Sequence, residues 1–187
     1  MRELSLNVLD IVQNSVSAGA SLIEIGVTES AESVMTIRIS DNGCGMDAQQ
    51  LEAVSDPFYT TRTTRKVGMG IPLYRMAAEQ TGGGLEIESQ KGVGTCVTAT
   101  FHTDSIDCAP LGDMAATMCV LIGANEAVDF IYTHTTPRGA FTVDTRNLRE
   151  LMQGVPLSEP DVLNWIRDYI REQTEIIGGG ALNFEND

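Results

Sequence analysis

The stretch "SDNGCGMD", residues 40–47, follows a run of good strand formers, "SVMTIRIS" at 33–40. In it an acid and an asparagine precede two glycines that flank a single cysteine, and a short helix is predicted directly afterwards, near 48–54. A hairpin turn requires only one glycine, whereas paired glycines also let a ligand approach the main chain. The stretch therefore raises the prospect of a binding loop between a strand and a helix.

The same spacing occurs again further along the chain. In "KVGMGIPL", Gly68 and Gly70 precede a helix predicted from about Ile71 to Gln80, and a basic cluster comes just before them: Arg62, Arg65 and Lys66. Because a helix start offers free N–H groups to an anion, this loop is a plausible phosphate cradle. The alternative is a solvated loop. A third stretch, "KGVGTCVTATF", leads into a strand and could also be a simple hairpin turn.

A helix is predicted over residues 4–17, and it is apolar around most of its girth. Its exception is a polar stripe that repeats at spacings of three and four residues, made of Asn7, Asp10, Asn14 and Ser17. Polar groups on a buried helix need partners. The stripe therefore either faces solvent or lines a ligand site.

The remaining patterns predict an α+β fold. Strands are expected at 23–28, 34–40, 85–89 and 96–101. The order helix, strand, strand, helix, loop, helix, strand, strand favours a two-layer α/β sandwich with helices on one face of a mostly antiparallel sheet.

A composition shift near 103–110 separates a first domain, 1–104, from a C-terminal α+β extension, 105–187. The extension is predicted to hold a helix at 111–123, a hairpin formed by 127–134 and 139–144, and helices at 145–152 and 159–176. The last helix has Ser158 as its expected cap, Pro160 at its start and Gly178 at its end. Its acidic character suggests a region that docks to a protein.

The composition indicates a cytoplasmic protein. The first residues do not resemble a secretory signal, and the longest apolar run, 115–124, is too short to span a bilayer. The four cysteines lack paired metal-ligand spacing and suit a reducing compartment, although a redox or metal role stays an alternative. The net charge of −14 argues against nucleic acid or an anionic membrane as a partner.

Taken together, these motifs resemble one superfamily over residues 3–102: the GHKL, or Bergerat, ATP-binding fold shared by gyrase, MutL, sensor histidine kinases and the large heat-shock chaperones. "LDIVQNSVSAGAS" is similar to the N box in its MutL form. "DNGCGM" matches the G1 box and "VGMGIPL" the G2 box. "DPFYTTR" is close to the F box of histidine kinases, and "SQKGVGTCVTATF" matches the final strand, turn and strand.

The resemblance implies ATP and Mg²⁺ as ligands. Asp41 would accept a hydrogen bond from the adenine amino group, and Asn14 would hold Mg²⁺ through its side-chain oxygen. Thr95 would line the rear of the pocket. The loop 59–70 would close over the nucleotide. The other ATP-binding residues that the resemblance implies are Gly43, Gly45, Met46, Phe58, Thr60, Thr61, Arg62, Gly68, Met69 and Gly70.

Two positions depart from the family pattern. Pro72 stands where the kinase G2 box usually has a third glycine, at a place in the first helical turn where its missing N–H is harmless. Asp10 stands where hydrolysing members usually have glutamate, the base that activates water. Asp10 is therefore expected to be either a catalytic base or a metal or water ligand.

Three functions remain open at this point. The first is a stand-alone kinase or phosphotransfer regulator that phosphorylates a protein partner on histidine or serine. The second is a slow ATPase switch of MutL type, and the third is a regulatory module that binds ATP without turnover. Self-phosphorylation on histidine is not expected, because His102 and His134 are the only histidines and both are predicted to be structural or exposed. A homodimer is kept open.

Overall fold

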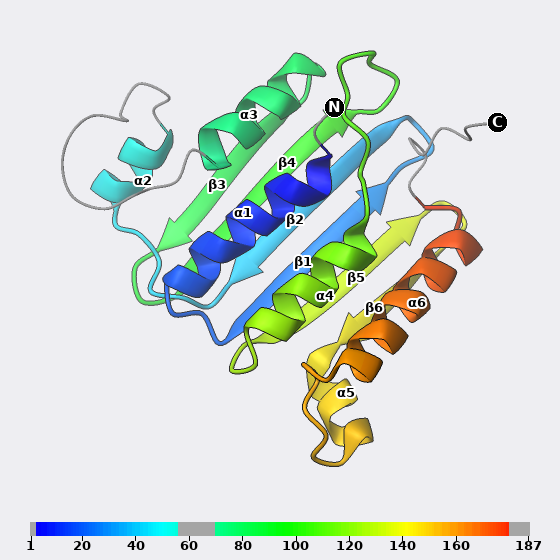
Figure 1. The fold of residues 1–187 in the computed structure, drawn as a ribbon. Helices are drawn as coiled ribbons and strands as arrows, with labels where there is room; N and C mark the ends of the chain where they lie inside the picture. Colours follow the sequence, from blue (N-terminus) through cyan, green and yellow to red (C-terminus); the bar gives the residue numbers. More distant parts are fainter. Residues whose placement is uncertain (1–2, 56–69, 180–187) are drawn as a thin grey trace.

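The computed structural model describes residues 3–55 and 70–179. They form a six-stranded sheet in the order β3-β4-β2-β1-β5-β6, with helices layered on one face (Figure 1). The strands are β1 (Leu22–Glu29), β2 (Val34–Asp41), β3 (Gly84–Gln90), β4 (Gly94–His102), β5 (Asp129–Thr136) and β6 (Gly139–Asp144). The helices are α1 (Leu4–Ser17), α2 (Ala48–Ser55), α3 (Gly70–Gln80), α4 (Met114–Ala124), α5 (Thr145–Met152) and α6 (Pro160–Ile176).

Strands β1 to β4 form the predicted antiparallel part of the sheet. The β1–β2 pair and the β3–β4 pair are hairpins, and β2 pairs with β4 so that Asp41 lies opposite Thr95. Side chains alternate along β1: Ile25 is buried under the helices, whereas its neighbour Glu24 is exposed. This alternation is what a sheet covered on one face requires, and the α+β class is confirmed.

The extension continues the same sheet. Strand β5 pairs with β1 in parallel, with Ile25 beside Tyr132, and β6 closes the sheet as an antiparallel edge strand. Helix α4 packs against α1, and α6 packs against α4, so the helical layer is extended as well (Figure 1). The change in composition near residue 104 thus falls between segments that share one hydrogen-bonded sheet.

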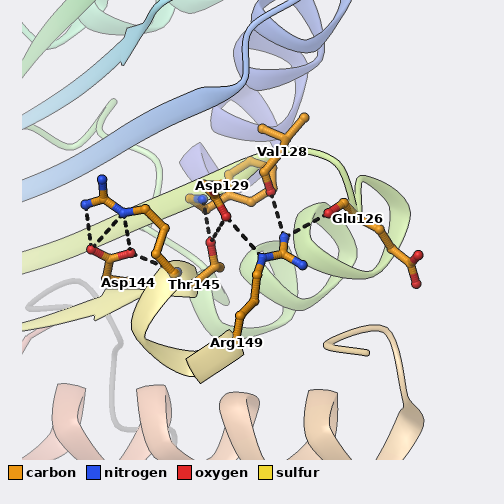
Figure 2. A network of polar contacts seen from close by, with 8 residues as sticks. Glu126, Val128, Asp129, Asp144, Thr145 and Arg149 are labelled. Carbon is orange, nitrogen blue, oxygen red and sulfur yellow. Dashed lines mark hydrogen bonds and ion pairs between the residues drawn. The ribbon is translucent and has the colours of Figure 1, made fainter. Parts of the chain in front are cut away.

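A network of polar contacts fixes α5 to the start of β5 (Figure 2). The Arg149 guanidinium donates to the Asp129 carboxylate at 3.1 Å and to the Glu126 carbonyl oxygen at 2.8 Å. Thr145 donates to the same carboxylate at 3.2 Å and accepts from the Phe130 N–H at 2.9 Å. These bonds satisfy polar groups where the sheet edge meets the helix.

One predicted helix start and one predicted helix cap were wrong. Helix α4 begins at Met114 rather than residue 111, because Gly112 has a φ of +81° and Asp113 caps the helix by accepting from the Ala116 N–H at 2.9 Å. Ser158 does not cap α6: its hydroxyl donates to the Glu126 carboxylate instead. Pro160 does begin that helix, as the sequence predicts.

His134 is part of a buried polar group between β1 and β5. Its Nε2 lies 2.7 Å from Oε1 of Glu29, and its Nδ1 lies 3.2 Å from the Tyr132 hydroxyl. The side chain is fully buried. The expected structural role of this histidine agrees with these contacts.

None of the helices among the described residues has the length and apolar character needed to cross a bilayer.

Candidate functional site

Asp41 ends β2 and is held in place by three donors. Its Oδ1 accepts from the Gly43 N–H at 2.9 Å and from the Thr95 N–H at 3.3 Å, and its Oδ2 accepts from the Ser15 hydroxyl at 2.6 Å. A carboxylate has about four acceptor positions. One position on Oδ2 is therefore left for an outside donor, such as the amino group of a flat heterocycle.

Ser15 is a site residue that the sequence analysis missed. It lies on the buried side of α1, off the polar stripe, and is only 5% exposed. The signal that could have identified it is a small hydroxyl residue on an apolar helix face, directly after Asn14. Because a buried hydroxyl needs a partner, its bond to Asp41 ties the helix to the strand end.

Hydrogen bonds connect the loop after Asp41 to the residues between α1 and β1. The Asn42 side-chain oxygen accepts from the N–H groups of Ser21 and Leu22, at 2.9 and 3.0 Å. The Cys44 N–H donates to the Ala18 carbonyl oxygen at 2.9 Å. These bonds hold the loop against the end of α1 and the start of β1.

The glycines of this loop are required by the protein's own packing. Gly45 has a φ of +63°, and a Cβ there would lie 2.0 Å from the Gln90 carbonyl oxygen. A Cβ on Gly94, in the β3–β4 turn, would lie 1.9 Å from the Asp41 carbonyl oxygen. Gly45 and Gly94 therefore let the loop and the turn close on each other, whereas the sequence pattern predicted that the Gly43–Gly45 pair admits a ligand.

Ser89 joins the loop to the turn and was also missed. Its hydroxyl accepts from the Met46 N–H at 2.8 Å, donates to the Gly94 carbonyl oxygen at 3.1 Å, and shares a 2.8 Å hydrogen bond with Thr95 Oγ1. Thr95 is thereby oriented beside Asp41. Nothing in the local pattern around Ser89 distinguishes it from an ordinary strand residue.

Asp10 and Asn14 lie one turn apart on α1, beside the start of α3. A Cβ on Gly70 would lie 3.2 Å from the Asp10 Cβ, so the first turn of α3 approaches this carboxylate closely. Asp10 is exposed and Asn14 is half-buried. Within the described part of the chain, no side chain bonds to the Asn14 amide.

The residues present fit Mg²⁺ bound together with nucleotide. No group of three or more His, Cys, Asp or Glu side chains among residues 3–55 and 70–179 could hold a metal ion. Mg²⁺ usually takes few protein oxygens and fills its other positions with water and phosphate. The Asn14 amide oxygen, with Asp10 one turn away, is a donor set of this kind.

The structure brings together Asp10, Asn14, Asp41, Gly43, Gly45, Met46, Gly70 and Thr95, all at the edge formed by α1, α3 and the end of β2. The other predicted site residues lie outside the described residues: Phe58, Thr60, Thr61, Arg62, Gly68 and Met69.

A separate cavity of about 380 Å³, lined by His134, Asp113 and Arg171 among others, contains none of the predicted site residues.

Residues 1–105 match the family of histidine kinase-, DNA gyrase B- and HSP90-like ATPases. The chain belongs to this family, and its first half is an ATP-binding domain of the histidine-kinase-like type. The family assignment made from the sequence motifs is thereby confirmed.

Curated relatives include sensor kinases. A putative sensor protein of Shewanella frigidimarina is 29% identical over 102 residues, which are 54% of this chain and 15% of that protein. The sensor protein kinase FleS of Pseudomonas aeruginosa is 37% identical over 106 residues, 56% of this chain and 25% of that protein. The methanogenesis regulatory histidine kinase FilI of Methanothrix harundinacea is 41% identical over 83 residues, 43% of this chain and 9% of that protein. This chain thus matches only a small part of each relative's length.

Among solved structures, the N-terminal domain of a DNA repair protein aligns with a TM-score of 0.53 and 20% sequence identity. The alignment covers 77% of this chain and 52% of that one. At this identity the similarity shows the fold alone.

Proposed function

We propose that this protein is an Mg-ATP-dependent regulator of kinase or phosphotransfer type that acts on a protein partner. The observation that carries the proposal is the placement of Asp10 and Asn14, one turn apart on α1, beside the start of α3. It supports a site in which the phosphates lie near the α3 N-terminus. The acceptor position that Asp41 leaves open supports a site in which the base is read there. The sensor kinases among the relatives support the transfer of phosphate to protein.

In the proposed reaction the acceptor is a serine hydroxyl or a histidine nitrogen of the partner. The bond between the γ-phosphorus and the β–γ bridging oxygen breaks, ADP leaves, and the acceptor atom bonds to phosphorus. Asp10 takes the proton that the acceptor loses. Bound Mg²⁺ would offset the charge of the phosphates, and the Asn14 amide oxygen would hold it.

A second candidate is a slow ATPase switch, in which water is the acceptor. The observation in its favour is that residue 10 is an exposed carboxylate beside the α3 start, where it could activate water. The MutL-like sequence that follows Asn14 points the same way. Fold membership does not choose between the two candidates.

The test follows nucleotide binding and turnover separately. Binding of a fluorescently labelled ATP is titrated with the wild type, Asp10→Asn and Asp41→Asn, and ADP release from Mg-ATP is then measured for each. Gln13→Ala is the matched control, because Gln13 is exposed on the same helix but off the polar stripe. We expect Asp41→Asn to lose binding, and Asp10→Asn and Gln13→Ala to retain it.

Turnover then separates the candidates. If the wild type binds ATP but releases no ADP, water is not the acceptor, and transfer of labelled γ-phosphate to a partner protein is the next measurement. If it releases ADP and Asp10→Asn does not, the ATPase switch is correct. Absence of ATP binding by the wild type would contradict both candidates.

A further inference from the structure

The outer face of α6 combines acidic and aromatic side chains. Helix α6 is the last helix of the layer, on the far side of α4 from α1 (Figure 1). One strip of its solvent side, here called the acidic strip, consists of Asp161, Asp168, Glu172 and Glu175. At helical spacing beside it runs an apolar strip of Trp165, Tyr169 and Ile176.

The side chains of the apolar strip are large and apolar, yet much of their surface is exposed to solvent. Trp165 is 48% exposed and Ile176 is 65% exposed, while Tyr169 is half-buried. The rings of Trp165 and Tyr169 stack with centroids 5.5 Å apart and planes 12° apart. The stack holds the indole in a fixed orientation on the surface. Grouped exposed apolar side chains with a polar border are typical of interaction sites.

The acidic strip has little compensating charge. Residues 103–187 carry 14 acids and 5 bases. Four of those bases already form ion pairs within the extension: Arg146 with Asp144, Arg149 with Asp129, Arg167 with Asp168, and Arg171 with Asp113. Among the described residues no base forms an ion pair with Asp161, Glu172 or Glu175. The face therefore offers negative charge to an outside partner.

We propose that the outer face of α6 docks a basic, arginine-containing segment of a partner protein. Arginine suits both strips, because its guanidinium pairs with carboxylates and stacks on an indole ring. Nucleic acid and anionic membranes carry the same sign of charge as the strip and are repelled. The chain's own residues 180–187 contain two acids and no base, so they do not complement the strip either.

The docking face is separate from the nucleotide site. Helix α6 lies over the β5–β6 end of the sheet, whereas α3 packs on β3 and β4 at the opposite end (Figure 1), and Asp41 ends β2. The proposal therefore does not depend on whether this protein transfers phosphate. A docked partner would leave the nucleotide site accessible.

Trp165 is the only tryptophan of the chain, so its emission reports on this face alone. The probe is a synthetic amphipathic peptide without tryptophan, with arginine on one face and leucine on the other. The comparison peptide has glutamate at the arginine positions. We expect the arginine peptide to shift Trp165 emission in the full-length protein, with binding that weakens as salt rises. The glutamate peptide should have no effect.

Two variants test how much each strip contributes to peptide binding. The measurement is the fluorescence anisotropy of a fluorescein-labelled peptide. Removing two charges with Asp161→Asn and Glu172→Gln should weaken binding by about fivefold. Trp165→Leu, which keeps an apolar side chain but loses the ring, should weaken it by roughly threefold. The matched control is Glu52→Gln with Glu86→Gln, which removes two exposed acids elsewhere and should leave binding unchanged.

Three outcomes would overturn the proposal. One is a control variant that loses as much affinity as Asp161→Asn with Glu172→Gln, which would make the binding a consequence of net charge. Another is peptide binding without any change in Trp165 emission. The third is self-association of the free protein that Asp161→Asn with Glu172→Gln abolishes, which would make a second copy the occupant.

Discussion

At Asp41 the protein fills three acceptor positions of one carboxylate and leaves the fourth open. Two of the donors are main-chain N–H groups, which no substitution at their own positions readily removes, except proline. The third is the Ser15 hydroxyl at 2.6 Å. Ser15 is therefore the side chain through which the orientation of Asp41 can be tested without changing its charge.

Ser15→Ala should weaken ATP binding by about fivefold to tenfold, because a hydrogen bond to a carboxylate is lost and Asp41 can rotate away from the base. The measurement is a titration with labelled ATP. Ser17→Ala is the matched control: Ser17 is exposed and bonds only within its own helix, to the Gln13 carbonyl oxygen at 2.8 Å. Equal affinity of Ser15→Ala and wild type would show that the main-chain donors suffice.

Two buried tyrosines give a second residue-scale prediction. Burial raises the pKa of both Tyr74 and Tyr132, so both phenols stay neutral. The Tyr132 hydroxyl bonds to His134, whereas the Tyr74 hydroxyl has no hydrogen-bond partner in the part of the chain that the structure describes. Tyr74→Phe should therefore leave the free energy of unfolding unchanged or raise it by about 1 kcal/mol.

Tyr132→Phe should instead lower the free energy of unfolding by roughly 1–2 kcal/mol, because it leaves a polar atom of buried His134 without its partner. Urea unfolding at neutral pH measures both variants. A larger loss for Tyr74→Phe than for Tyr132→Phe would mean that the Tyr74 hydroxyl is satisfied in solution.

At the scale of elements, the site depends on the contact between the loop after β2 and the β3–β4 turn. Gly45→Ala should destabilise the protein by about 2 kcal/mol or more, because it places a Cβ against the Gln90 carbonyl and strains a backbone with positive φ. Because this loop joins Asp41 to Met46, ATP affinity should fall together with the stability. Calorimetry and ATP titration test both effects.

The matched control for this contact is Gly84→Ala. Gly84 begins β3, and a Cβ there would meet nothing within 4 Å. The Gly84→Ala variant should therefore keep the melting temperature and the ATP affinity of the wild type. If Gly45→Ala behaved like Gly84→Ala, the loop would be able to shift away from the turn without loss.

At the scale of the whole molecule, the sheet couples the ATP-binding domain to the extension. Seven residue pairs align β1 with β5, from Leu22 beside Asp129 to Thr28 beside Thr135. We predict that the full-length chain unfolds in one transition, with equal calorimetric and van't Hoff enthalpies. Two separated transitions would mean that the extension melts independently of the ATP-binding domain.

Local patterns predicted most of the elements. Helix α1 and helix α5 have the predicted bounds, and the strands differ from their predicted ranges by at most a few residues at each end. The reason is that apolar periodicity and glycine positions are properties of adjacent residues. The start of α4 was predicted three residues too early, because Gly112 and the Asp113 cap were not recognised as its boundary. The Ser158 cap of α6 was wrong because the Ser158 hydroxyl bonds to Glu126, which only the fold brings close.

By itself the sequence determined the family, the α+β class and the residues expected around ATP. The reason is that each motif is a short segment, and the types and spacing of its adjacent residues are enough to recognise it. Only the tertiary structure decided that Ser15 and Ser89 hold the site together, and that β5 lies beside β1. A parallel pairing between strands about 100 residues apart leaves no local pattern, since its hydrogen bonds are made by main-chain groups that every residue carries.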